Sequence, residues 1–277
     1  MKLIILASTL IILSCASSKK ERTALEKKAD LYYSRGTGHL MKKNYTKAIK
    51  NLLQANKIAP NNSKTLNNLG MAHFFKNDKQ NAIALIQKSL KIDPKNTDAR
   101  VNYASILFHE KKYLSSEKQY KKVLKDLTYE KQQRTHYNLG LLYEKINKKK
   151  SALKSYRQAL KIDPYYCPAN YKIALIAFKK KKFNLASKQF YNATKGSCYN
   201  NVLAHLFQAR SLRQIGKTKN AIKKYELILK EFPSTKYEEI VQKGLVNAKN
   251  ELNESETGLD IASIKEQYEQ MSKRNYE

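Results

Sequence analysis

Histidine, cysteine and serine are the side chains that most often carry catalysis, and in this sequence their spacing does not support it. The 277 residues include five histidines and three cysteines. His109-Glu110 begins an HExxH pattern that fails at Tyr113, no two cysteines have CxxC spacing, and no segment fits GxSxG or GxxxxGK[ST]. We therefore expect a non-enzymatic protein with no catalytic residue, no metal site and no cofactor.

Cys15 is the residue whose surroundings point to a defined modification. An apolar run from Leu3 to Leu13 is too short to span a bilayer, but it suits the central region of a signal peptide. The run ends in Ile12-Leu13-Ser14-Cys15, which resembles a bacterial lipobox. That resemblance implies cleavage before Cys15 and acylation of Cys15 by lipid chains such as palmitate. Ala16 then implies sorting to the outer membrane. An ordinary signal peptide or an N-terminal anchor is the alternative.

Residues 1–14 are thus predicted to be a lipoprotein signal peptide, and residues 15–28 an acylated N-terminus with a flexible polar tether. The rest of the chain is predicted to be helical, because only 8 glycines and 5 prolines occur in 277 residues. Sandwiches, barrels and propellers need turn residues every ~8–12 positions.

A recurring segment reveals how these helices are organised. It ends in proline each time and spans Ala55–Pro60, Ser89–Pro94, Ala159–Pro164 and Ile228–Pro233. With small residues upstream, this period of about 34 residues resembles the tetratricopeptide repeat (TPR), a hairpin of helices A and B. The resemblance implies an all-α, right-handed α-solenoid. Its six predicted repeats are 29–62, 63–96, 97–132, 133–166, 167–201 and 202–235.

The sequence after the last repeat divides in two. Residues 236–253 have apolar residues at helical spacing and are predicted to form a capping helix, which the exposed end of a repeat array requires. Residues 254–277 are polar, and we expect a tail with at most a short helix near 264–271.

Cys167 and Cys198 are the candidates for a disulfide. They fall at positions 1 and 32 of the fifth repeat, which lie at the same end of an antiparallel hairpin. Exported proteins commonly pair their cysteines. Two free thiols in a helix-end loop are the alternative.

A partner-binding groove is expected on helix A of each repeat, because TPR solenoids bind peptides on that face, chiefly at positions 2, 5, 9 and 12 of each repeat. The candidate positions form an apolar and aromatic stripe: Met71, Phe74, Val101, Phe108, Tyr137, Leu141, Tyr171, Leu175 and Phe178. The basic and asparagine residues of a carboxylate clamp are incomplete, so the stripe suits an apolar or amphipathic helix better than an acidic tail. Packing between repeats is the alternative role of these residues.

The lipobox and the six repeats together resemble the type IV pilus biogenesis/stability TPR lipoproteins, the PilF/PilW pilotin family with its Tgl-like social gliding motility proteins. The most specific similarity is in Asp126–Glu130 with Thr135–Leu141, and in Phe232–Tyr237. The resemblance implies a non-enzymatic assembly factor, lipid-anchored through Cys15 at the periplasmic face of the outer membrane. Its partner would be a secretin subunit. A generic periplasmic TPR scaffold for another envelope protein is the alternative.

The net charge of +31 invites comparison with nucleic-acid-binding proteins. No RNA-binding motif is present, and the predicted export disfavours nucleic acid as a partner. The lysine runs 148–150 and 179–182 fall at turns between helices A and B, where solvated side chains are expected. The charge also favours attraction to an anionic membrane surface.

Overall fold

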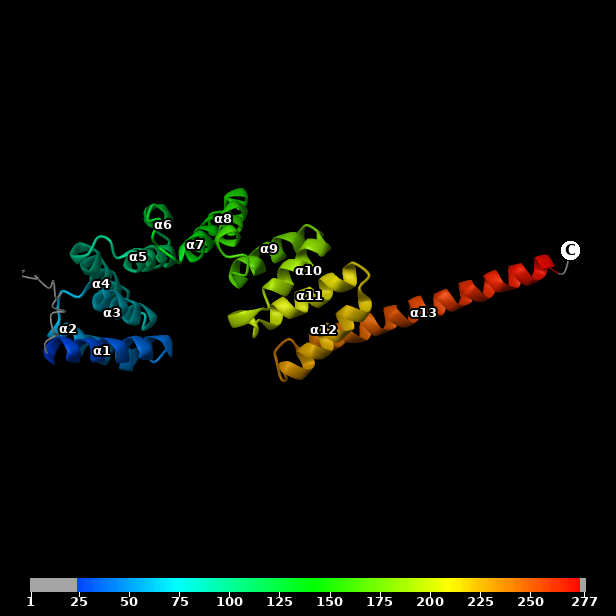
Figure 1. Ribbon diagram of the computed structural model, residues 1–277, viewed down its shortest axis with the longest axis horizontal. Helices are drawn as coiled ribbons and strands as arrows, with labels where there is room; N and C mark the ends of the chain where they lie inside the picture. The colour runs from blue at the N-terminus through cyan, green and yellow to red at the C-terminus, as the bar shows by residue number, and fades with distance from the viewer. Residues whose placement is uncertain (1–23, 275–277) are drawn as a thin grey trace, which may run out of the picture. The chain divides into compact units, whose positions relative to one another are not determined.

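The computed structural model describes residues 24–274, so Cys15 and the predicted signal peptide lie outside the described residues. This range contains thirteen α-helices, one short 3₁₀ helix and no strand (Figure 1), which confirms the all-α prediction. The α-helices are α1 (Ala24–Met41), α2 (Tyr45–Ile58), α3 (Ser63–Phe75), α4 (Lys79–Ile92), α5 (Thr97–His109), α6 (Tyr113–Val123), α7 (Gln132–Lys145), α8 (Lys149–Ile162), α9 (Cys167–Lys179), α10 (Phe183–Asn192), α11 (Val202–Gln214), α12 (Thr218–Glu231) and α13 (Glu238–Arg274), with the 3₁₀ helix η1 at Gly196–Cys198.

The chain divides into two compact units between Asn102 and Tyr103, within α5. In the first unit α1 packs on α2, α3 packs on α4, and α2 contacts α3. Ala48, Leu52, Leu69 and Ala72 form its buried core. The helices approach closely at glycine: a Cβ at Gly70 would lie 2.7 Å from Cγ1 of Ile86. This is the close contact for which a TPR hairpin requires a small residue.

The second unit repeats this pairing. The pairs α7/α8, α9/α10 and α11/α12 pack as hairpins, α10 also contacts α11, and α12 contacts α13. Three small cores lie along it, centred on Tyr156, on Phe190 and on Tyr225. Consecutive hairpins that bury one another's faces are typical of a TPR solenoid.

A left-handed residue ends helix A in every hairpin. Lys43, Asn77, Lys111, Asn147 and Lys181 have φ between 54° and 64°, and Gly216 has φ of 72°. In each case the backbone N–H two positions before the next helix bonds back to helix A, as from Lys111 to the carbonyl of Phe108 at 3.0 Å. The same turn thus recurs at the repeat period.

The helix boundaries differ from the sequence expectation at both ends. Helix α1 begins at Ala24, inside the stretch predicted to be tether, because residues 24–28 continue its helical turn before the buried Ala29. Helix α13 does not end near 253 but continues to Arg274, so the tail predicted at 254–277 is helical for most of its length. In the first part of α13, Val241 and Ala248 are buried, whereas residues 253–257 are exposed.

Candidate protein-binding surface

The predicted groove residues are half-buried with one exception. Val101 is only 1% exposed, so it belongs to the core and is removed from the partner-contacting set. The other eight keep part of their surface accessible. Met71 and Phe74 lie on α3 in the first unit. The remaining six lie in the second unit, with Phe108 on α5 and five residues on α7 and α9.

Three of these six, Tyr171, Leu175 and Phe178, meet in one cluster together with Phe207, which was not predicted. We call these four residues the aromatic surface. All four are partly exposed and pack on the buried core of α9, α10 and α11. The Phe178 ring lies 5.2 Å from that of Phe207, edge to face, and the Tyr171 ring lies 5.9 Å from that of Phe190. Edge-to-face aromatic pairs add stability beyond the area that they bury. The surface is therefore fixed in place while one side remains open.

Tyr137 and Leu141 pack on a neighbouring core in the same unit. The Tyr137 ring lies 5.8 Å from the rings of both Tyr156 and Tyr166. Burial raises the pKa of Tyr137 to about 12. Its hydroxyl, like any tyrosine hydroxyl at neutral pH, is protonated and can donate a hydrogen bond to a bound chain.

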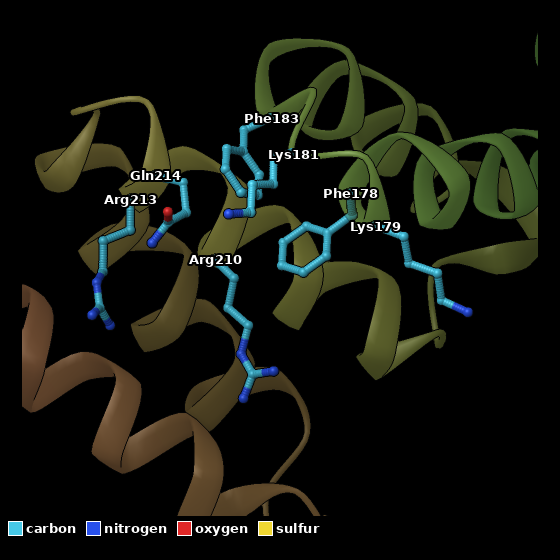
Figure 2. Close-up of a pocket in the computed structure, with 7 residues that line it drawn as sticks. All are labelled: Phe178, Lys179, Lys181, Phe183, Arg210, Arg213 and Gln214. Carbon is cyan, nitrogen blue, oxygen red and sulfur yellow. The ribbon is translucent and has the colours of Figure 1, made fainter.

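A pocket of about 470 Å³ adjoins the aromatic surface. It is lined by Phe178 and Lys179 at the end of α9, Lys181 in the turn that follows, Phe183 at the start of α10, and Arg210, Arg213 and Gln214 on α11. Figure 2 shows these side chains, with the ammonium end of Lys179 pointing away from the others. Its lining has four cations and no carboxylate. Arg213 is paired with Glu251 at 3.0 Å, and the guanidinium of Arg210 lies 5.6 Å from the Phe207 ring centroid. This pocket therefore combines two phenylalanine rings with an excess of positive charge.

The asparagines that resemble parts of a carboxylate clamp are engaged within the fold. Asn102 donates from Nδ2 to Oδ1 of Asn67 at 2.9 Å, and Asn67 donates to Asn68 at 3.0 Å. Asn68 in turn donates to Thr37 at 2.9 Å. Because these amides satisfy one another, they offer little to a terminal carboxylate.

Cys167 and Cys198 are joined by a disulfide, with Cα atoms 6.2 Å apart. Cys167 begins α9 and Cys198 ends η1. The bond therefore ties the start of the fifth repeat to the segment that leads into the sixth.

Sequence reasoning missed Phe183, Phe207 and the two arginines of the pocket. A signal was available for Arg210 and Arg213, because they occupy positions 9 and 12 of the sixth repeat. These are the positions used to choose residues in the other repeats. Phe183 and Phe207 lie outside that rule, and only packing brings their rings to Phe178.

The described range of residues 24–274 lacks two other kinds of site. It contains no group of three or more His, Cys, Asp or Glu side chains placed to hold a metal ion. Likewise, none of its helices is long and apolar enough to cross a membrane.

Comparison with known proteins identifies the repeats. Tetratricopeptide repeat models match residues 63–96, 134–166 and 206–235. Three of the six predicted repeats therefore match tetratricopeptide repeat models, and the consecutive helix hairpins of the described residues are typical of a TPR solenoid. Proteins with such repeats generally provide non-enzymatic scaffolds for protein–protein interaction. A search among curated protein sequences gives no match.

Among solved structures, two similar folds come from pilus proteins. Pseudomonas aeruginosa pilF aligns with a TM-score of 0.66 at 19% identity, covering 80% of this chain and 99% of that one. PilW, a widely conserved type IV pilus biogenesis factor, aligns with a TM-score of 0.63 at 17% identity, covering 77% and 98%. A tetratricopeptide repeat protein from Parabacteroides merdae gives 0.53 at 18% identity, covering 81% and 88%. At these identities the similarity is one of fold.

Proposed function

We propose that this protein is an outer-membrane lipoprotein that acts as a pilotin-like assembly factor in type IV pilus biogenesis. Acylated Cys15 would hold it at the periplasmic face, and its repeats would bind secretin subunits while these insert and multimerise. The lipobox-like Ile12–Cys15 segment and the fold similarity to PilF and PilW support this proposal.

The observation that carries the proposal is the aromatic surface beside a cationic pocket. Half-buried rings offer apolar area to a partner without first having to be uncovered, and such anchors dominate binding energy at interfaces. Lys179, Lys181 and Arg210 would favour a partner that carries carboxylates. The expected ligand is therefore an amphipathic secretin segment with apolar and acidic residues.

Two variants test the surface separately. Phe178→Glu places a charge within the aromatic surface, and Arg210→Glu reverses a charge at the pocket without removing a ring. We expect both to weaken binding of purified secretin subunits by at least tenfold, since truncating a central anchor costs about 2 kcal/mol or more. Tyr191→Glu is the matched control, because Tyr191 is an exposed aromatic residue on α10 that does not line the pocket. Helical circular dichroism shows whether each variant is folded.

The cellular test measures secretin multimers in the outer membrane. Deleting the gene should leave secretin as monomers on a denaturing gel run without boiling, and Arg210→Glu should reduce the multimers in part. Unchanged multimers after deletion would contradict the pilotin role. The alternative is a generic periplasmic TPR scaffold for a different envelope protein, and that role predicts unchanged secretin multimers after deletion.

A further inference from the structure

Helix α8 carries an excess of positive charge, which is not part of the aromatic surface or of its pocket. Its 14 residues, KKSALKSYRQALKI, include five basic residues and no acidic one. Lys150, Lys154, Arg157 and Lys161 follow one another at spacings of four, three and four, which places them on one face of the helix. We call these four residues the α8 stripe. At 1.5 Å per residue it runs for about 16 Å.

The α8 stripe faces solvent, and its positive charges have no acidic partner within the described chain. All four side chains are exposed, and none has an ion pair with another part of the described chain. The stripe lines a shallow depression of about 550 Å³ together with Leu153 and Gln158, and no carboxylate contributes to it. Lys148 and Lys149 line a second depression that shares Lys150, so the positive surface continues around the start of the helix.

Carboxylates near α8 in the chain or on the preceding helices are already engaged, and Asp163, two residues after Lys161, accepts a hydrogen bond from the backbone N–H of Tyr165 at 2.9 Å. Glu144 accepts a hydrogen bond from Tyr156 at 2.6 Å and pairs with Lys172 at 3.0 Å. Glu117 accepts from Tyr143 at 2.8 Å and pairs with Lys121 at 2.6 Å. The hydrogen bond from Lys121 is the largest cause that lowers the pKa of Glu117, and the Lys148 charge adds to it. The stripe therefore retains its full charge.

Stability of the helix does not explain the stripe. Like charges at i,i+4 destabilise a helix, and Lys150/Lys154 and Arg157/Lys161 are two such pairs. The feature is also local. Among the equivalent helices, α2 and α4 each have three basic residues and no acidic one, α10 has a single lysine, and α12 includes Glu226 and Glu231, so none of them carries five basic residues without an acidic one. An external anion is the simplest partner for a charge that is concentrated in this way.

Exposed apolar side chains at the end of the stripe indicate which anion it suits. Ile162, the last residue of α8, is 46% exposed, and Tyr165 in the following turn is 73% exposed. Basic side chains beside an exposed aliphatic and an exposed tyrosine are typical of segments that lie on a bilayer surface, where the rings sit at headgroup level. A dissolved polyanion would use the charges but not the apolar pair.

We propose that α8 is a membrane-surface contact, in which the α8 stripe binds the phosphates of anionic lipids and Tyr165 enters the headgroup layer. The surface differs from the one assigned to secretin, and the proposal requires neither a secretin nor acylation of Cys15. In a lipid-anchored protein it would add a second attachment point and orient the repeats relative to the bilayer.

A single introduced tryptophan makes the contact visible, because the natural chain contains none. The full chain with Cys15→Ser and Tyr165→Trp is mixed with vesicles of phosphatidylcholine alone or with phosphatidylglycerol added. We expect the indole emission of this variant to move to shorter wavelength only with phosphatidylglycerol, and the shift to weaken as salt is added. Met41→Trp with Cys15→Ser is the control, since Met41 is 80% exposed on α1, and the emission of that variant should not move.

Charge reversal then assigns the effect to the stripe. Lys150→Glu, Lys154→Glu and Arg157→Glu together should lower affinity for phosphatidylglycerol vesicles on the order of 100-fold, at about 1 kcal/mol per basic residue near the surface. Lys47→Glu, Lys57→Glu and Lys88→Glu change the net charge equally on α2 and α4 and should change affinity less than threefold. An equal loss in both triple variants, an unshifted emission from the Tyr165→Trp variant, or stripe-dependent binding to heparin but not to vesicles would each overturn the proposal.

Discussion

The hairpins α7/α8 and α9/α10 follow one repeat pattern but are closed by different chemistry. Helix α8 has 14 residues and ends before Asp163-Pro164, whereas α10 has 10 residues and ends at Asn192. In the first hairpin the proline turn leads directly into the next helix. In the second, η1 and Cys198 occupy the place of that turn.

The α7/α8 hairpin is held by a tyrosine set against a glycine. The Tyr156 ring is fully buried at the position where Gly140 lacks a side chain. Its hydroxyl donates to Glu144 at 2.6 Å, and Glu144 also pairs with Lys172 of α9. Burial, followed by the bond to Glu144, raises the pKa of Tyr156 above the ordinary range. This hairpin is therefore held by packing, and the Tyr156 hydroxyl stays protonated across physiological pH.

The segment that closes the α9/α10 hairpin, from η1 into α11, is held instead by groups that respond to redox conditions and pH. The disulfide fixes Cys198, and the Nε2–H of His205 donates to the carbonyl of Tyr199 at 2.8 Å. The His205 ring also contacts those of Tyr199 and Phe232. Neighbouring repeats can therefore share a fold and differ in the conditions under which each is stable.

Among the changes that affect the two hairpins differently, loss of the disulfide should lower the stability of the protein most. Cys167→Ser with Cys198→Ser frees a loop with a sequence separation of 31, which should lower the free energy of unfolding by about 3–4 kcal/mol. That corresponds to a fall of roughly 10 °C in the midpoint of thermal unfolding, measured by circular dichroism.

Reductant provides the matched control for this prediction. Dithiothreitol should lower the midpoint of the natural chain by a similar amount and leave the double serine variant unchanged. Equal midpoints for the natural chain with and without reductant would show that the disulfide contributes nothing to stability.

Acid should affect the same closing segment next. Burial, and then the charge of Lys224, lowers the pKa of His205 to about 4, with a smaller contribution from Lys195. The unfolded chain binds a proton near pH 6.5 and the folded chain does not, so stability falls as pH drops from about 6.5 towards 4. Between pH 7.5 and 5.0 this amounts to about 2 kcal/mol, or a fall of roughly 4–8 °C in the unfolding midpoint.

His205→Phe tests that assignment. Phenylalanine keeps the ring contacts and cannot be protonated, so the midpoint should be lower at pH 7.5, because the Tyr199 carbonyl loses its donor, but much less dependent on pH. A small slope should remain, since burial also lowers the pKa of His136. An unchanged slope in the variant would assign the acid sensitivity to other groups.

The sequence was sufficient for the parts of this comparison that depend on periodicity. The recurring proline segments predict helix pairs, and small residues such as Gly70 and Gly140 predict where helix A is approached closely. The position of Cys167 and Cys198 within one repeat places them at the same end of a hairpin, where the structure joins them. Each of these follows from a local pattern that repeats at fixed spacing.

The rest depends on contacts that no periodic pattern encodes. Val101 fits the groove rule but is buried, because exposure depends on what packs above a position. Lys111 and Lys181 adopt φ near 60°, a region that favours glycine, since the turn geometry outweighs the residue's preference. The sequence did not predict that α13 continues past residue 253, because a polar helix beyond the last hairpin has no apolar stripe by which it could be recognised.

In the α7/α8 hairpin, the packing of Tyr156 against Gly140 can be tested in the same way. A change there should alter the unfolding midpoint least. A Cβ at position 140 would meet the ring at Cε1 and Cδ1, and the ring cannot turn aside without losing the bond to Glu144. Overpacking costs about 1–3 kcal/mol, while alanine is better than glycine in a helix by about 1 kcal/mol. Gly140→Ala should therefore destabilise by up to about 2 kcal/mol net, measured as a lower unfolding midpoint.

Gly38→Ala isolates the helix-propensity part of that balance, because nothing lies within 4 Å of a Cβ at this position of α1. It should raise the midpoint slightly, so the two alanine variants should shift stability in opposite directions. Adding Tyr156→Phe to Gly140→Ala releases the ring from Glu144, and part of the loss should return if the pinned hydroxyl is what makes the site rigid. A double variant as unstable as the sum of the two single ones would instead mean that the ring is held by its neighbours in the core.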